Sequence, residues 1–213
     1  MTLKKQQLAF HFDSGACSGC KACQMACRDR HDLDRNGLWR RVYEVTGGEW
    51  RPSGTVWVPE VFAYNLSIAC NHCLEPVCRD VCPAAAIRKR RDGIVWIDAD
   101  RCLGCRYCEW ACPYGAPRFD ERAGVMTKCH FCMDAVDRGG KPACVEACPM
   151  RALDFGTLED LKARHSEAAQ PFPLPDPDLT KPALLITPHR DAKRAGPRTA
   201  SVANAEEVGY PRK

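Results

Sequence analysis

Short runs of apolar residues, separated by polar ones, determine the secondary structure that this sequence predicts. Residues 8–13 (LAFHFD) and 152–156 (ALDFG) each predict a strand, and residues 94–97 predict a third. An Asp-Gly turn at 92–93 precedes the third strand, and a short helix is predicted between Pro83 and that turn. All of these elements are short, so the chain is expected to turn often.

Two longer segments have a different pattern. Residues 37–65 are rich in β-branched and aromatic side chains around a Gly-Gly and a Ser-Gly pair, which predicts a β-hairpin that covers a face or binds a partner. Residues 159–169 predict a helix. The proline-rich stretch that follows, PFPLPDPDLTKP, predicts an extended tail that wraps a surface.

Composition limits the size of the core and the kinds of partner. The chain has 213 residues, 45% of them hydrophobic, with 16 prolines and 15 glycines, so one or two small domains are expected. A net charge of +4 does not indicate a nucleic-acid partner. No apolar run approaches the ~18 residues of a membrane helix, and the apolar part of the N-terminus is too short for a secretory signal. We expect a chain that is soluble by itself, or peripheral to a membrane through another subunit.

Cysteine is the residue that narrows the chemistry, because all 16 fall into four groups of four. The groups are Cys17, Cys20, Cys23 and Cys27; Cys70, Cys73, Cys78 and Cys82; Cys102, Cys105, Cys108 and Cys112; and Cys129, Cys132, Cys144 and Cys148. Disulfides give no reason for groups of four. They are also disfavoured because C-x-x-C closes too small a loop for a good structural disulfide.

Zinc is the alternative, because four-cysteine zinc sites are built from two C-x-x-C pairs. The first and third groups, however, contain C-x-x-C-x-x-C, and the third thiol of that run has no place in a two-pair zinc site. A 4Fe-4S cube accounts for it. Three corners are held by cysteines spaced by two residues, and the fourth iron is ligated from elsewhere. The spacing therefore predicts four 4Fe-4S clusters.

The last cysteine of each run is expected to serve a neighbouring cluster. Cys112 lies four residues after Cys108, about one helical turn further on, and Pro113 then ends or redirects the helix. In two-cluster ferredoxins the fourth cysteine of such a run ligates the other cluster. The groups must therefore pair: the second with the third, which are neighbours in sequence, and the first with the fourth.

This pairing predicts an α+β fold of two ferredoxin-like domains, one inserted in the other, with a β-hairpin insertion and an extended C-terminal tail. Residues 1–36 and 118–158 would form the domain with the first and fourth cysteine groups. Residues 67–117 would form the domain with the second and third groups. Residues 37–66 are the hairpin insertion, and residues 159–213 are the helix and the partner-wrapping tail.

Four stretches carry a resemblance to a known family: FAYNLSIACNHC, CLGCRYCEWACPYGAP, MTKCHFC and ACVEACPMRALDFG. They resemble the iron-sulfur subunits of anaerobic dimethyl sulfoxide reductases, within the wider family of four-cluster subunits of molybdenum oxidoreductases. The similarity covers residues 8 to about 190. All 16 cysteine positions match the family pattern.

The resemblance implies a ligand set for each cluster. Cluster 1 would use Cys17, Cys20, Cys23 and Cys148; cluster 2 would use Cys129, Cys132, Cys144 and Cys27; cluster 3 would use Cys70, Cys73, Cys78 and Cys112; and cluster 4 would use Cys102, Cys105, Cys108 and Cys82. In the family, cluster 1 is nearest the molybdenum and cluster 4 is nearest the quinol. Electrons would run from cluster 4 to cluster 1.

The resemblance also implies partners. A catalytic subunit with a bis-molybdopterin guanine dinucleotide cofactor and an integral membrane anchor that oxidises menaquinol would complete a heterotrimer. This chain would then be an electron-transfer subunit with no catalytic residue and no membrane span of its own. The implied location is the periplasmic face of the inner membrane, reached by co-export with a twin-arginine catalytic subunit; the cytoplasmic face is the alternative.

Three other functions are compatible with parts of the pattern. The chain could serve another molybdenum reductase, for polysulfide, tetrathionate or a similar acceptor. It could be a free-standing polyferredoxin, although the long hairpin and tail exceed what a carrier needs. A zinc-stapled scaffold is the third.

Among the charged residues, Arg106 and Lys128 are candidates for tuning cluster potentials. The alternative for each is an ordinary solvated or partner-facing charge.

Overall fold

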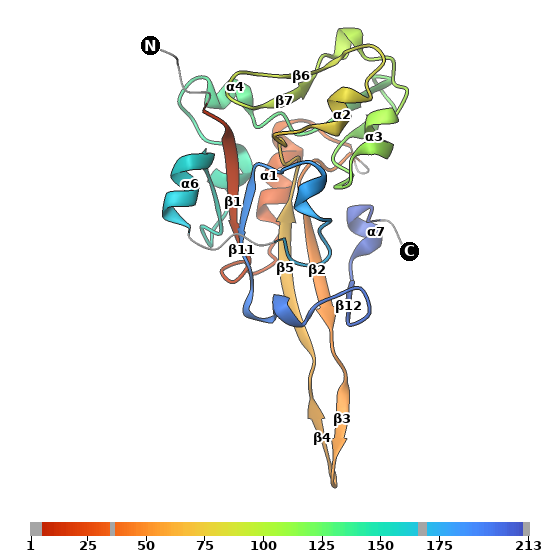
Figure 1. The fold of residues 1–213 in the computed structure, drawn as a ribbon, viewed down its shortest axis with the longest axis vertical. Helices are drawn as coiled ribbons and strands as arrows, with labels where there is room; N and C mark the ends of the chain where they lie inside the picture. The colour runs from red at the N-terminus through yellow and green to blue at the C-terminus, as the bar shows by residue number, and fades with distance from the viewer. Residues whose placement is uncertain (1–5, 35–36, 166–169, 211–213) are drawn as a thin grey trace.

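The computed structural model describes residues 6–34, 37–165 and 170–210. Two three-stranded sheets form its centre, and Figure 1 shows a long hairpin projecting from one end. In the first sheet, β1 (Leu8–Asp13) lies between β10 (Leu153–Thr157), which is antiparallel to it, and β11 (Leu184–Thr187), which is parallel. The strands predicted on either side of the outer cysteine groups are therefore confirmed, and they pair with each other.

The second sheet is built on the predicted hairpin. β2 (Arg41–Gly47) pairs antiparallel with β5 (Phe62–Ile68) over their whole length, and β12 (Ala200–Val202) pairs with the outer part of β2. Beyond this sheet, β3 (Trp50–Ser53) and β4 (Val56–Pro59) continue the hairpin as an arm whose residues are all exposed. The hairpin therefore has two parts: β2 and β5 contribute to the core, and β3 and β4 form the exposed arm.

Two small hairpins lie among the cysteine loops. β6 (Ile87–Lys89) pairs with β7 (Val95–Ile97), and β8 (Arg118–Asp120) pairs with β9 (Val125–Thr127). The helix predicted after Pro83 is wrong, because the chain there turns and then enters β6. Ala85 has a φ of 48°, and this left-handed conformation is incompatible with a right-handed helix.

The helices are short. The α-helices are α1 (Ala22–Arg30), α2 (Val77–Asp80), α3 (Tyr107–Ala111), α4 (Met133–Val136), α5 (Ala143–Glu146), α6 (Leu158–Arg164) and α7 (Ala205–Val208). The 3₁₀ segments are η1 (Ala99–Arg101), η2 (Pro177–Leu179) and η3 (Arg190–Arg194). The helix predicted at 159–169 is α6, and residues 166–169 of that prediction lie outside the described residues. No helix in the described part of the chain has the length and apolar character needed to cross a membrane.

The main core is shared by the two sheets. It contains side chains from β1, β2, β5 and β10, together with Phe131 from the last cysteine group. The C-terminal segment was expected to wrap a partner, but β11 and β12 place much of it on this chain's own sheets. The reason is that its apolar residues, such as Leu184 and Ile186, are buried against β1. Short helices and mostly antiparallel strands make this an α+β fold, as predicted.

Candidate iron-sulfur cluster sites

Three cavities are each lined by four cysteines. The first is lined by Cys17, Cys20, Cys23 and Cys148, the second by Cys70, Cys73, Cys78 and Cys112, and the third by Cys82, Cys102, Cys105 and Cys108. The identical donor sets indicate the same kind of occupant for all three. Each cavity takes its fourth cysteine from a different sequence group.

The four remaining thiols also gather in one place. Cys27, Cys129, Cys132 and Cys144 are all buried. Burial raises the pKa of Cys27 and of Cys129, and charge on Cys144 would raise both further, as would charge on Cys132 for Cys27 and on Cys27 for Cys129, so these thiols lie close together. We number the thiol sets as follows: the first is Cys17, Cys20, Cys23 and Cys148; the second is Cys27, Cys129, Cys132 and Cys144; the third is Cys70, Cys73, Cys78 and Cys112; and the fourth is Cys82, Cys102, Cys105 and Cys108.

Local chain geometry explains how one run of cysteines serves two sets. In the run that ends at Pro113, Cys108 lies within α3 and Cys112 immediately follows its last residue. One turn of helix separates the two thiols, so they point to different cavities. Cys23 and Cys27 have the same spacing within α1, and they belong to the first and second sets.

Two loops have matching backbone shapes. Gly19 and Gly104, each directly before the second cysteine of its run, have φ values of 73° and 65°. Lys21 and Arg106, each directly after that cysteine, are also left-handed, at 60° and 65°. A Cβ on Gly104 would lie 2.5 Å from the carbonyl oxygen of Gly124. Glycine is therefore required both by the left-handed turn and by this neighbouring backbone.

Hydrogen-bond donors reach sulfur in every set. Backbone N–H groups donate to Cys102, Cys82, Cys112 and Cys129 over 3.3–3.5 Å. Side chains do the same: Lys128 Nζ lies 3.4 Å from Cys70 Sγ, and Ser67 Oγ lies 3.3 Å from Cys23 Sγ. Donors to sulfur stabilise thiolate over thiol and are among the levers that set cluster potential.

Burial acts in the opposite direction on the free thiols. It raises the pKa of Cys27, Cys73 and Cys108 to about 12, and it raises that of Cys129 well above its ordinary value. Without a bound metal these side chains would therefore be neutral at pH 7. Iron binds the thiolate form, so loading the sites must release protons.

The donor sets fit a cluster better than a single ion. Among residues 6–34, 37–165 and 170–210, no group of three or more Cys, His, Asp or Glu side chains converges as ligands of one metal ion do. Four-cysteine zinc sites need every sulfur about 2.3 Å from a common centre. Here the thiols stand around the walls of cavities instead. That arrangement favours a cube, which is gripped at separate corners.

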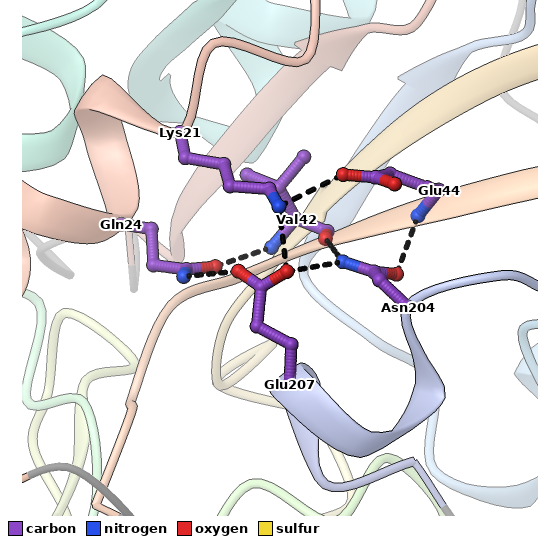
Figure 2. A network of polar contacts seen from close by, with 6 residues as sticks. All are labelled: Lys21, Gln24, Val42, Glu44, Asn204 and Glu207. Atoms are coloured by element: carbon purple, nitrogen blue, oxygen red, sulfur yellow. Dashed lines mark hydrogen bonds and ion pairs between the residues drawn. The ribbon is translucent and has the colours of Figure 1, made fainter.

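A polar network fixes the loop of the first set against the C-terminal segment (Figure 2). Lys21 Nζ, between Cys20 and Cys23 in sequence, is 2.5 Å from Glu207 Oε2 and 2.8 Å from Glu44 Oε1. Gln24 Nε2 donates to Glu207, and Asn204 Nδ2 donates to the carbonyl of Val42. Residues 183 positions apart thus hold this loop in place.

Sequence reasoning missed two buried residues beside the sulfurs. Arg40 is 2% exposed and Ser67 is 1% exposed, and both lie close to Cys23. An arginine at the start of a predicted hairpin gives no signal of burial, because the residues that bury it come from distant parts of the sequence. Arg106, a candidate for tuning potential, lies over the Phe119 ring and forms an ion pair with Glu109, and its effect on the potential stays a prediction.

Comparisons with known proteins agree with this chemistry. Residues 61–158 match the family model described as a 4Fe-4S dicluster domain. The B chain of anaerobic dimethyl sulfoxide reductase from Escherichia coli is 50% identical over 202 residues, which cover 95% of this chain and 98% of that protein. The B chain of polysulfide reductase from Wolinella succinogenes is 38% identical over 84% of this chain and 92% of its own length. The B subunit of sulfite dehydrogenase from Allochromatium vinosum is 35% identical over 88% and 85%. The prediction of 4Fe-4S clusters is confirmed.

Proposed function

The chain belongs to the family of anaerobic dimethyl sulfoxide reductase B chains, and we propose that it is the electron-transfer subunit of such a complex. Members of this family are iron-sulfur subunits that are not catalytic alone. The present chain carries four 4Fe-4S clusters. It receives electrons from an integral membrane anchor that oxidises menaquinol. It delivers them, two per turnover and one at a time, to a molybdopterin subunit that reduces dimethyl sulfoxide or a related S- or N-oxide.

The arrangement of the thiol sets is the observation that carries this proposal. Each set supplies four sulfurs, and consecutive sets are neighbours. Cys23 and Cys144 link the first set to the second, and Cys129 and Cys70 link the second to the third, because each pair interacts electrostatically. α2 and α3 pack together and carry cysteines of the third and fourth sets. The order supports a linear path, and we propose that this path runs through the two ferredoxin-like units expected from the sequence.

Exposure of the thiols supports entry and exit at the two ends of this path. Cys20 of the first set and Cys105 of the fourth are exposed, whereas all four thiols of the second set are buried. Electron transfer falls off steeply with distance, so a partner must approach an exposed cluster. The first and fourth sets are the ones available to partners.

Large apolar side chains are exposed beside the fourth set. Leu103 and Trp110 are 70% and 73% exposed, and Leu103 and Tyr107 line the cavity of this set. Large exposed apolar groups beside a functional cavity mark an interaction surface. We assign this surface to the membrane anchor. The chain is then peripheral to the inner membrane, and we place it on the periplasmic face.

The arm formed by β3 and β4 is assigned to subunit contact. Trp50 and Trp57 lie on one face of it with Pro52 and Pro59, because the register pairs Trp50 with Pro59 and Pro52 with Trp57. The two tryptophans are 58% and 64% exposed. Tryptophan is enriched among the residues that dominate binding energy at protein interfaces.

A second candidate is the corresponding subunit of a different molybdenum reductase, favoured by the 38% identity to the B chain of a polysulfide reductase. The acceptor is selected in the catalytic subunit, so the present chain is compatible with either assignment. Purification of the native complex and assay of its acceptors distinguishes them.

The decisive experiment quantifies iron and acid-labile sulfide in the anaerobically isolated complex and records low-temperature EPR spectra during reduction. We expect about sixteen Fe and as much sulfide per copy of this chain, after subtraction of any iron measured in the other subunits. Far less iron, or zinc in its place, would overturn the four-cluster proposal. Recovery of the chain only as a monomer would instead favour the free-standing carrier.

A further inference from the structure

We propose that Arg40 and Lys128 are internal counter-charges of the electron path, one at each of its first two junctions. Arg40 lies between the first and second thiol sets, and Lys128 lies between the second and third. Each places a cationic side chain beside the clusters on both sides and so favours their reduced state. The inference rests on the ligand sets proposed above.

Arg40 is placed by contacts from both directions. Its Nη1 donates to the carbonyl and to the hydroxyl of Ser67, both at 3.1 Å, and that hydroxyl lies 3.3 Å from Cys23 of the first set. Arg40 also interacts electrostatically with Cys27 and Cys144 of the second set. The guanidinium carbon sits 4.8 Å from the centroid of the Phe10 ring, which closes its remaining side.

Lys128 bridges the next junction in the same manner. Its Nζ donates to Cys70 Sγ of the third set at 3.4 Å and to the carbonyl of Cys129, in the second set, at 3.0 Å. It also donates to the carbonyl of Val95 and lines the cavity of the third set. The side chain is 3% exposed.

Neither cation has a conventional counter-ion. Within the described part of the chain, no carboxylate forms an ion pair with Arg40 or Lys128; their side chains donate instead to backbone carbonyls, to the Ser67 hydroxyl and to the Cys70 sulfur. A buried charge without a partner costs several kcal/mol. The negative charge that offsets it must therefore come from the thiol sets. A 4Fe-4S cluster with four thiolates carries roughly 2− when oxidised, and one more when reduced.

The sign of the effect follows from electrostatics. Reduction adds one negative charge to a cluster, and a nearby positive charge stabilises that product more than the oxidised form. In a low-dielectric interior the attraction is weakly screened. Removing Arg40's charge should therefore make the clusters of the first two sets harder to reduce, and removing that of Lys128 should act on the second and third.

The test uses the anaerobically purified complex, with potentials measured by EPR-monitored redox titration. In Arg40→Gln we expect the equilibrium constant for reducing clusters one and two to fall at least tenfold, or 59 mV for one electron, with cluster four unchanged. Lys128→Gln should shift clusters two and three in the same direction. Arg40→Lys and Lys128→Arg retain the charge and should stay close to the native potentials. Arg106→Gln, at an exposed cation, is the control and should shift neither pair.

Comparing the neutral with the charge-retaining variants separates the effect of the side chain's charge from the effect of its shape. A neutral variant that loses iron while its charged counterpart keeps the full complement also supports the inference, because the charge is then needed for loading. Neutral variants with full iron and native potentials would overturn it. So would equal effects in the charged and neutral variants. Wild-type iron content tests the four-cluster proposal separately, and single Cys→Ser variants test the ligand sets, so failure of one proposal is distinguishable from failure of the other.

Discussion

Cys108 and Cys112 are four residues apart, yet their thiols line different cavities, that of the fourth set and that of the third. α3 ends between them, and this short helix turns one sulfur away from the other. Replacing each by serine should therefore remove a different cluster. We expect Cys108→Ser to abolish the EPR signal of the fourth cluster and Cys112→Ser that of the third. Loss of the same signal in both variants would show that the ligation is not crossed.

The two ends of the path can be distinguished by a second pair of variants. Cys102→Ser should damage the fourth cluster and block menaquinol-driven turnover, while an artificial donor that reaches the catalytic subunit directly still supports reduction. Cys20→Ser, the matched change at the opposite end, should block menaquinol-driven turnover as well, but with loss of the first cluster's signal. Menaquinol-driven turnover that survives Cys102→Ser would refute the assigned order.

The arm can be tested without touching any cluster. We expect Trp50→Ala with Trp57→Ala to weaken association of this chain with a partner subunit by tenfold or more, because buried interface tryptophans commonly contribute over 2 kcal/mol. Iron content should be unchanged, since both side chains are exposed and distant in sequence from every cysteine. Ser53→Ala, on the other face of the same strand, serves as the control. An intact complex from the double variant would contradict the assignment.

The network in Figure 2 predicts a modest effect on stability. Glu207→Ala removes the acceptor for Lys21, Gln24 and Asn204, and we expect a loss of ~1 kcal/mol because the ion pair is partly exposed. Thermal denaturation of the loaded protein measures it. The first cluster should also become more accessible to chelators, because its loop is no longer fixed. Ser201→Ala, an exposed position in β12, should change neither property.

Stability should fall as the pH drops below neutral, in part through His11. Its ring stacks on that of His165 with centroids 3.4 Å apart, and burial, followed by the charge of His165, lowers its pKa from 6.5 to about 4. In that window the unfolded chain binds a proton that the folded chain does not. His11 therefore contributes stability above pH 6.5 that is lost as the pH falls towards 4, by at most ~3 kcal/mol.

His11→Gln removes this titration, and the midpoint of thermal unfolding should then depend less on pH between 7.5 and 5.5 than in the native protein. An unchanged pH dependence would show that His11 is protonated equally in the folded and unfolded states. The comparison needs only the difference between the two proteins, so any acid sensitivity of the clusters themselves cancels.

Much of the fold can be predicted from the sequence. The strand at 8–13 has the predicted bounds, and the strand near 152–156 is displaced by one residue. The helix after Pro83 was predicted wrongly because its alanines favour helix, whereas the structure uses this stretch to turn back to Cys82 and into β6. Local propensity was overridden there by the pairing of β6 with β7.

The sequence alone determined that the cysteines bind 4Fe-4S clusters, because ligand type and ligand spacing are local properties. The two or three residues between neighbouring cysteines decide which corners of a cube their thiols can reach. Only the tertiary structure decided the contacts between residues that are distant in sequence. It buried Arg40 beside the sulfurs and placed the C-terminal strands on the two central sheets. Such contacts join residues distant along the sequence, and they form because burying apolar surface and pairing strands outweigh the entropy of bringing those segments together.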